Sequence, residues 1–350
     1  MTKLKKIPKN KPTCLGTGLV ALDVILNGNP ATPAKLCVGG SCGNVISILS
    51  YLGWDSKPIA RLSKNTATKN ILKDFSNFNV KTDLVSKADD GSTPIIIHRI
   101  LKDKNGNPKH RFEFRVPGTN DWLPGYKPVL SSAVETITKK QSKSQVFYFD
   151  RVSRSSIDLA KFYKEKGALI IFEPTSYKED KQFSECLAVA DIVKFSSDRI
   201  TNYSQLFPSP IAPLEIETLG NDGLQYRLKS GTKKGWQKIA PFKLTNIIDA
   251  AGAGDWCTAG IINELGQNGV KSFYSANKDG IEKALNIGQA MGAINCTFDG
   301  ARGIMYNMDY KALNELISKL VTKKDISKIS TVSSVKIATI KNFQFETLLD

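Results

Sequence analysis

Short apolar runs alternate with amphipathic stretches along most of the 350-residue chain. Apolar runs at residues 14–26 and 57–62 flank a glycine-rich loop and a stretch, residues 44–52, whose apolar side chains recur at helical spacing. This pattern predicts a strand, a helix and a strand, followed by a helix at about 66–78. Residues 94–101 and 110–115 lie on either side of a turn rich in Asn, Gly and Pro, which predicts a β-hairpin.

The alternation becomes regular from residue 145. We expect strands at 145–149, 168–172, 191–195 and 213–218, and helices at 155–166, 180–188 and 197–205. This order indicates an α/β protein with a mainly parallel sheet and helices on both faces. Antiparallel strands within 223–241 and helices at 254–266, 278–296 and 309–321 complete the pattern. We interpret residues 326–350 as an appended C-terminal extension.

The chain is strongly basic, with 49 Lys and Arg against 33 Asp and Glu and a net charge of +16. Such a balance favours anionic partners, which include nucleic acid, anionic membrane surfaces and phosphorylated substrates. Part of the charge is local, because lysines crowd the first twelve and the last thirty residues. We interpret these runs as solvated basic tails rather than a polyanion site, so nucleic acid is not the expected partner.

The cysteine pattern and the absence of long apolar segments bear on location. Six cysteines lie far apart with no C-x-x-C pair, which favours reduced thiols over a zinc site or a disulfide framework. No secretory signal pattern follows the N-terminal lysines, and no window approaches 18 uncharged apolar residues. We therefore expect a cytoplasmic protein with no membrane partner.

The segment Ile247-Ile248-Asp249-Ala250-Ala251-Gly252-Ala253-Gly254-Asp255 joins an apolar strand end to a helix. The first N–H groups of a helix have no intrahelical partner, so a glycine-rich helix start forms a positive concavity suited to phosphate. Asp255 at its edge could accept a proton from an attacking hydroxyl group. The alternative is an ordinary glycine-rich helix start with Asp as N-cap.

A second cluster, Gly39-Gly40-Ser41-Cys42-Gly43-Asn44, also opens a predicted helix, and Asp23 ends the strand before it. Small residues would let a polar ligand approach the backbone, while Asp23 and Asn44 could hydrogen-bond hydroxyl groups. Alone, the cluster is equally typical of a tight turn with Ser41 as N-cap.

Together, these clusters resemble the ribokinase-like (PfkB) carbohydrate kinase family over about residues 13–305. The matching order is Asp23, then Gly-Gly-Ser-x-x-Asn at 39–44, then Thr218-Leu219-Gly220 with Gly223, then Asp249-x-x-Gly-Ala-Gly-Asp255. The resemblance implies a three-layer sandwich with a mainly parallel sheet and a small β lid. It also implies transfer of the γ-phosphoryl group of ATP, with Mg²⁺ as cofactor, to a hydroxyl of a sugar, nucleoside or similar alcohol.

The resemblance further implies roles for individual residues. It assigns the catalytic base to Asp255 and the anion hole to Gly252, Ala253 and Gly254. Substrate contacts would be made by Asp23, Gly39, Gly40 and Asn44, with Asp150 as a further candidate. Nucleotide contacts would be made by Thr218, Gly220, Gly223 and Asn286. The kinase domain would span 13–325, with lid segments at about 27–38 and 93–126 that close over the substrate.

The chain departs from the family pattern at several places, one of them Cys257, where the family usually has Phe two residues after the base. Where the family usually has Asn-x-x-Glu, this chain reads Ser196-Ser197-Asp198-Arg199, so the acid that helps to organise hydrated Mg²⁺ is missing or shifted to Asp198. Ala250-Ala251 replaces a threonine-containing pair, which bears on a monovalent cation at Asp249. Glu173-Pro174-Thr175 stands where Asp-Pro-Asn is frequent, so Glu173 is either an acid near the phosphates or the cap of a turn.

Three functional hypotheses follow. The first is an ATP-dependent kinase of a sugar or sugar derivative with Asp255 as base, which could act as a homodimer. The second is a nucleoside kinase, which aromatic lid residues such as Phe112, Phe114 or Trp122 would favour by stacking on a base. The third is a catalytically weak binding or regulatory protein on the same fold. His98 and His110, the two histidines, are most simply structural or surface residues.

Overall fold

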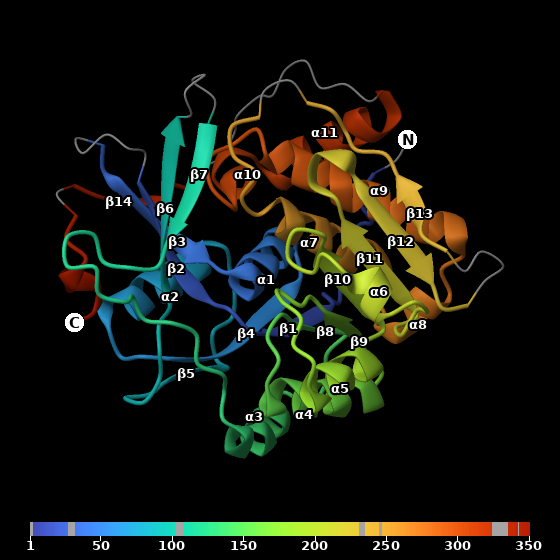
Figure 1. The fold of residues 1–350 in the computed structure, drawn as a ribbon, viewed down its shortest axis with the longest axis horizontal. Helices are drawn as coiled ribbons and strands as arrows, with labels where there is room; N and C mark the ends of the chain where they lie inside the picture. Colours follow the sequence, from blue (N-terminus) through green and yellow to red (C-terminus); the bar gives the residue numbers. More distant parts are fainter. Residues whose placement is uncertain are drawn as a thin grey trace.

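The computed structural model describes residues 3–26, 32–102, 108–230, 235–244, 247–323, 335–341 and 343–350. Within these ranges a large twisted sheet carries helices on both faces, and a smaller sheet lies beside it (Figure 1). The predicted lid segments at 27–38 and 93–126 fall partly outside the described residues, because residues 27–31 and 103–107 are not among them.

Among the described residues, the large sheet has nine strands in the order β13-β12-β11-β10-β9-β8-β1-β4-β5. In that order they are Gln237–Ile239, Leu224–Leu228, Leu214–Thr218, Ile192–Ser196, Leu169–Phe172, Val146–Phe149, Thr13–Thr17, Asp55–Leu62 and Val85–Lys87. All neighbouring pairs from β11 to β5 are parallel, whereas β12 and β13 are antiparallel. The carboxyl ends of β1, β8, β9, β10 and β11 therefore meet at one edge, where α/β proteins bind their ligands.

Helices cover both faces of this sheet and give the expected three layers. One face packs against α1 (Ser41–Tyr51), α7 (Ala253–Leu265), α9 (Lys278–Asn295) and α11 (Tyr310–Lys323). The other packs against α3 (Val134–Lys140), α4 (Arg154–Glu165) and α5 (Lys181–Val189). Residues alternate between the two cores along each strand: Tyr148 belongs to the first core and Phe147 to the second. Short helices α6 (Tyr203–Leu206), α8 (Val270–Tyr274) and α10 (Gly303–Asn307) join these elements.

Helices α7 and α9 approach each other closely because glycines line their contact. A Cβ atom on Gly260 would lie 2.8 Å from the Cα atom of Gly288, and a Cβ on Gly292 would lie 2.6 Å from the carbonyl oxygen of Ala253. No larger side chain fits at these contacts without moving the helices. The start of α7, which carries the predicted anion hole, is thus held against α9.

The smaller sheet has the strand order β14-β3-β2-β6-β7. Its strands are Ala338–Ile340, Ala34–Gly39, Ala21–Leu26, Ile95–Lys102 and Pro108–Glu113. Helix α2 (Thr66–Asn77) packs against β2 and β3. Strands β6 and β7 pair antiparallel, which confirms the predicted hairpin, and they project away from the large sheet (Figure 1). The C-terminal residues join this sheet through β14, and the carbonyl of Asp350 accepts a hydrogen bond from the Thr66 N–H.

Several predictions about local structure are wrong. Residues 14–26 are not one strand: β1 ends at Thr17 in the large sheet, and β2 begins at Ala21 in the smaller one. Gly18 lies between them at φ +140°, and Asp23 consequently lies within β2 rather than at a strand end. Residues 197–205 are mainly a turn, and only Tyr203–Leu206 form a helix. The segment predicted as a glycine-rich loop also contains strand β3 (Ala34–Gly39), which the hydrophobic pattern did not predict because some of its residues are small.

Candidate active site

The predicted anion hole lies at the N-terminus of α7. Gly252 is the N-cap residue and has φ +74°, a conformation that favours glycine. A Cβ atom there would lie 2.1 Å from the carbonyl oxygen of Ala301, so glycine is required on steric grounds as well. Among the described residues, the N–H groups of Gly254 and Asp255 have no hydrogen-bond partner. The helix start therefore presents free donors and the positive end of the helix dipole.

Asp255 lies in the first turn of α7, where Asn44 of α1 contacts it. Asn44 Nδ2 donates a hydrogen bond of 2.7 Å to Asp255 Oδ2. Loss of hydration and the nearby charge of Glu173 raise the pKa of Asp255 to about 7. A carboxyl group whose pKa lies near neutrality is suited to accept a proton. The structure thus brings together one residue from each of the two sequence clusters.

Glu173, which follows β9, lies in a buried polar cluster below the anion hole. Its Oε1 pairs with Lys194 Nζ of β10 at 2.6 Å, and its Oε2 accepts hydrogen bonds from the hydroxyl groups of Tyr148 (3.1 Å) and Thr258 (2.7 Å). Lys194 is only 2% exposed, and its Nζ lies 3.6 Å from the position that a Cβ on Gly254 would take. The ammonium group therefore places positive charge directly under the anion hole.

Asp23, Gly39 and Gly40 form a second part of the site at the start of α1. The Asp23 carboxyl group fills the space of a side chain on Gly39, since a Cβ there would lie 2.0 Å from Asp23 Cγ. Gly40 has φ +77° and lies against the backbone of Leu19. Burial and the charge of Asp249 raise the pKa of Asp23 to about 7, although Arg302 opposes the shift. Asp23 is therefore a second carboxyl that can be protonated near neutral pH.

Asp150 follows β8 and faces the turn between β1 and β2. Its Oδ1 accepts a hydrogen bond of 2.9 Å from the Leu19 N–H, and burial raises its pKa. Its Oδ2 is buried without a hydrogen bond among the described residues, although Arg151 Nη1 lies 3.3 Å away. The Oδ1 atom of Asn44 is also buried and unsatisfied. Two such acceptors at one edge of the sheet indicate a site for hydroxyl donors.

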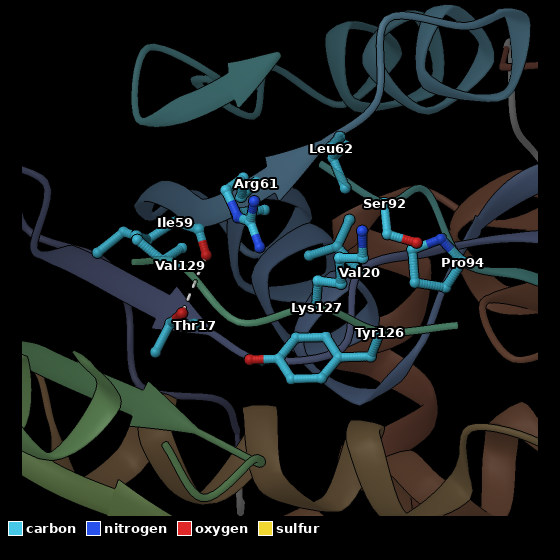
Figure 2. A pocket seen from close by; sticks show the side chains of 12 residues that line it. Thr17, Val20, Ile59, Arg61, Leu62, Ser92, Pro94, Tyr126, Lys127 and Val129 are labelled. Carbon is cyan, nitrogen blue, oxygen red and sulfur yellow. Dashed lines mark hydrogen bonds between the residues drawn. The ribbon is translucent and has the colours of Figure 1, made fainter. Parts of the chain in front are cut away.

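A small, shallow pocket adjoins this region at the carboxyl ends of β1 and β4. The ring of Tyr126 and the side chain of Arg61 lie on opposite sides of it (Figure 2). Gly18, which contacts Asp150, is among its lining residues. Arg61 and Lys127 both donate to the carbonyl of Asp90, so these cations hold the surrounding chain.

The predicted nucleotide turn follows β11. The Thr218 hydroxyl donates to the carbonyl of Phe195, and the Leu219 N–H donates to the carbonyl of Gly223. Gly223 at φ +89° packs against the backbone of Ile239, whereas Gly220 at φ +57° faces open space. Asn286 lies on α9, the helix that Tyr226 of β12 contacts through Glu282. The hairpin β12–β13 and α9 thus flank the turn.

The predicted metal acids do not form a metal centre. Within the described ranges, no group of three His, Cys, Asp or Glu side chains is placed to hold a metal ion. Both carboxylate oxygens of Glu173 accept hydrogen bonds from protein donors, and Asp198 is an exposed residue of the turn after β10. Among the described residues, side chains therefore form no direct Mg²⁺ centre, and a contact of Glu173 or Asp198 with hydrated Mg²⁺ through water stays a prediction.

Asp249, the predicted contact of a monovalent cation, holds the loop before α7. Its Oδ1 accepts a hydrogen bond from the Ala251 N–H at 2.7 Å, and its Oδ2 accepts one from the Gly300 N–H at 2.8 Å. His98 of β6 is buried, with Nε2 at 3.6 Å from Asp249 Oδ2. The smaller sheet therefore contacts the loop of the anion hole through a histidine that we expected to be structural or on the surface. The side chain of His110 lies outside the described residues.

Sequence reasoning missed Lys194, Tyr148 and Thr258, the partners of Glu173. One signal was available: Lys194 lies inside the apolar run Ile192–Ser196, and strands of a parallel sheet are usually apolar throughout. A lysine there must be paired. Arg302 was also missed; it is buried against Asp74 and donates to the carbonyl of Val38 just before Gly39.

Comparisons with known proteins agree with this geometry. The profile of the pfkB family carbohydrate kinases matches residues 27–306. The chain is 21% identical over 316 residues to a probable chloroplastic fructokinase-6 of Arabidopsis thaliana, covering 77% of this chain and 79% of the relative. Among solved structures, fructokinase of Xylella fastidiosa with bound ATP has a TM-score of 0.65 at 16% identity, covering 88% of this chain and 98% of that one.

A second solved structure is aminoimidazole riboside kinase of Salmonella enterica, complexed with aminoimidazole riboside and an ATP analogue. Its TM-score is 0.61 at 16% identity, covering 87% of this chain and 99% of that one. These likenesses confirm the ribokinase-like α/β fold that the sequence predicted. With a family match that spans most of its residues, the chain belongs to the pfkB family of carbohydrate kinases, phosphotransferases with an alcohol group as acceptor.

Proposed function

We propose that this protein transfers the γ-phosphoryl group of ATP to a hydroxyl group of a sugar or sugar derivative, with Asp255 as general base. The observation that carries the proposal is the position of Asp255, which combines a pKa of about 7 with the free N–H groups of the α7 N-terminus. The carboxylate accepts the proton of the attacking hydroxyl group, and the N–H groups stabilise charge on the phosphoryl group.

The substrate hydroxyl groups are proposed to bind between the two sheets. Asp23, Asp150 and Asn44 supply the acceptors, and two of these groups carry oxygen atoms without a protein donor in the described structure. Gly39 lets the Asp23 carboxyl group lie against the backbone, and Gly40 packs on Leu19, so the two glycines hold Asp23 and the start of α1 in place for the substrate. The smaller sheet would act as the lid that excludes water during transfer.

ATP is proposed to bind along the turn that contains Thr218, Gly220 and Gly223, with Asn286 of α9 near the adenine. Gly220 leaves open space at this turn. Mg²⁺, which neutralises phosphate charge, would arrive with ATP and be held chiefly by phosphate oxygens and water, because the protein offers few free carboxylates here. A monovalent cation at Asp249, action as a homodimer and a cytoplasmic location remain further predictions, and fractionation and sedimentation would test the last two.

The experiment is a panel of sugars and sugar derivatives assayed for ADP release with wild type and Asp255→Asn. The amide keeps the shape of the side chain and loses the base, so turnover should fall by about 10²–10⁴-fold. Asp279→Asn is the matched control, because Asp279 also lies in the first turn of a helix but is exposed on α9. Full turnover in Asp255→Asn would contradict the mechanism, and ADP release with no member of the panel would contradict the function.

A nucleoside is the second candidate substrate, and the feature that supports it is the exposed aromatic ring of Phe112 in the smaller sheet. Phe112 pairs with His98 across β6 and β7, with ring centroids 4.8 Å apart, and His98 pairs with Ile25 of β2. Because side chains alternate along a strand, Phe112 lies on the same face as Asp23. Half of its surface is exposed, so its ring is available to stack on a flat group.

The two candidates differ in their response to Phe112→Leu. A nucleoside substrate would lose stacking, so its KM should rise about tenfold while the KM of a simple sugar stays unchanged. Trp122→Leu is the control, because Trp122 lies outside β6 and β7 and the guanidinium of Arg115 already lies over its ring, 3.8 Å from the centroid. Equal KM values in wild type and Phe112→Leu for every nucleoside that the enzyme phosphorylates would exclude the stacking role.

A further inference from the structure

The turn after β10 places Arg199 beside the strand end that leads into the nucleotide turn, within electrostatic reach of Asp255. The Arg199 N–H donates to the carbonyl of Ser196 at 3.0 Å, which closes the turn. The Ser197 N–H donates to the carbonyl of Thr218 at 3.0 Å, which ties the turn to the end of β11. Arg199 therefore lies at the same sheet edge as Glu173 and next to the strand end from which the nucleotide turn begins.

The guanidinium of Arg199 differs from the other cations near the site because it has no partner among the described residues. Lys194 pairs with Glu173, Arg151 with Asp150 and Arg302 with Asp74. Arg199 is exposed, and among the described residues its guanidinium has no ion pair or hydrogen bond. An unpaired guanidinium at this edge of the sheet keeps its five donors for a ligand.

The charge of Arg199 reaches the reaction centre. Arg199 and Lys194 both act to lower the pKa of Asp255, against the larger effects of lost hydration and Glu173. Lys194 is buried below the anion hole and bound to Glu173, so Arg199 is the cation that can move to meet a ligand. The planar guanidinium matches phosphate oxygens in a bidentate geometry.

We propose that Arg199 binds the β- and γ-phosphates of the nucleoside triphosphate and neutralises part of their charge. The proposal rests on the proposed function, because it requires ATP to lie between Gly220 and Asp255. Because protein donors engage both oxygens of Glu173, a cation from the protein then does part of the work of charge neutralisation. Arg199 thus contacts the nucleotide, and Asp255 remains the base.

The test measures nucleotide binding by titration calorimetry in EDTA, where no metal ion shields the phosphates. ATP, ADP and AMP are titrated into wild type, Arg199→Gln and Lys271→Gln. Lys271 is an exposed lysine of α8, at the opposite edge of the sheet, so its loss removes the same net charge away from the site. Arg199→Gln should weaken ATP about tenfold or more and ADP by less, and leave AMP within about twofold of wild type.

The remaining outcomes separate the two proposals. ATP binding unchanged in Arg199→Gln, or AMP weakened as much as ATP, would overturn the phosphate contact while the kinase function stands. A wild type that binds no ATP with or without Mg²⁺ would overturn both. Loss of ATP affinity in Lys271→Gln equal to that in Arg199→Gln would show a general effect of net charge and would also overturn the contact. Arg199→Lys should retain part of the affinity, because a single ammonium cannot make the bidentate contact.

Discussion

Asp255 and Glu173 lie next to the same first turn of α7, yet the protein treats their carboxyl groups differently. Glu173, on the floor of the anion hole, receives three donors, from Lys194, Tyr148 and Thr258. Asp255, at its rim, receives one, from Asn44. A carboxylate whose oxygens are all engaged fixes the backbone around it, whereas one that has lost hydration with few donors has a raised proton affinity. The comparison distinguishes a supporting acid from a reactive one.

Removing Lys194, the cation under the anion hole, should have the largest effect on stability. In Lys194→Met the charge of Glu173 stays buried without its ion pair, so the free energy of unfolding should fall by about 3–5 kcal/mol. Urea denaturation followed by circular dichroism measures the change. The double variant Lys194→Met/Glu173→Gln should recover much of the loss, because the buried charge is then gone. A double variant as unstable as the single one would show that packing, not charge, dominates.

Removing the charge of Asp255, at the rim of the anion hole, should instead stabilise the protein. The pKa of Asp255 is about 7 in the folded protein against an ordinary 3.8, so its contribution to stability is lost as the pH rises from about 4 to 7. Asp255→Asn should therefore increase the free energy of unfolding by about 2 kcal/mol at pH 8, with a smaller change at pH 4. Denaturation at both pH values measures this difference. If Asp255→Asn were less stable than wild type at pH 8, the charged Asp255 carboxylate would not destabilise the folded protein.

The pH profile of kcat/KM should show how the charge of Glu173 affects the ionisation of Asp255. A general base must be ionised, so kcat/KM should fall as the pH drops through about 7. Glu173→Gln removes the neighbouring negative charge that raises the pKa of Asp255, and should shift this acid limb by about one unit to lower pH. The shift is measured with the best substrate of the panel. An acid limb that stays in place would show that another group titrates.

The smallest effect should come from Asp198, the exposed acid of the neighbouring turn. Asp198→Asn should raise the Mg²⁺ concentration for half-maximal rate about twofold, since hydrated Mg²⁺ on ATP is contacted through water. Glu173→Gln should leave this concentration unchanged, because its oxygens already face protein donors. A Mg²⁺ titration at saturating substrate measures both. A larger change in Glu173→Gln than in Asp198→Asn would show that Glu173 contacts hydrated Mg²⁺.

Strands β8 to β11 could be predicted because each is a short, mainly apolar run next to an amphipathic helix. Strand β9 at Leu169–Phe172 and helix α9 at Lys278–Asn295 lie within a residue of their expected positions. The prediction was wrong where apolar character continued through a change of sheet, as between β1 and β2. Hydrophobicity records burial and not the partner against which a strand is buried, so residues 14–26 looked uniform.

Part of the site was also present in the local sequence. The conformation of Gly252 and the free N–H groups after it depend on neighbours within a few residues, so the motif that ends at Asp255 predicts them directly. The contact between Asn44 and Asp255 spans 211 residues, and the pairing of Lys194 with Glu173 joins two neighbouring strands. No local pattern encodes such contacts, because they depend on strand order and on the packing of α1 against α7.

The sequence by itself determined the alternating α/β architecture, the family and the glycine-rich helix start, since local backbone sterics and burial periodicity specify each of them. Only the tertiary structure decided which carboxyl groups lose their hydration and which receive donors. It placed His98 beside Asp249 and added β14 to the edge of the smaller sheet. It also left the guanidinium of Arg199 unpaired among the described residues. These features arise from through-space electrostatics and packing between distant segments, which act only once the chain has folded.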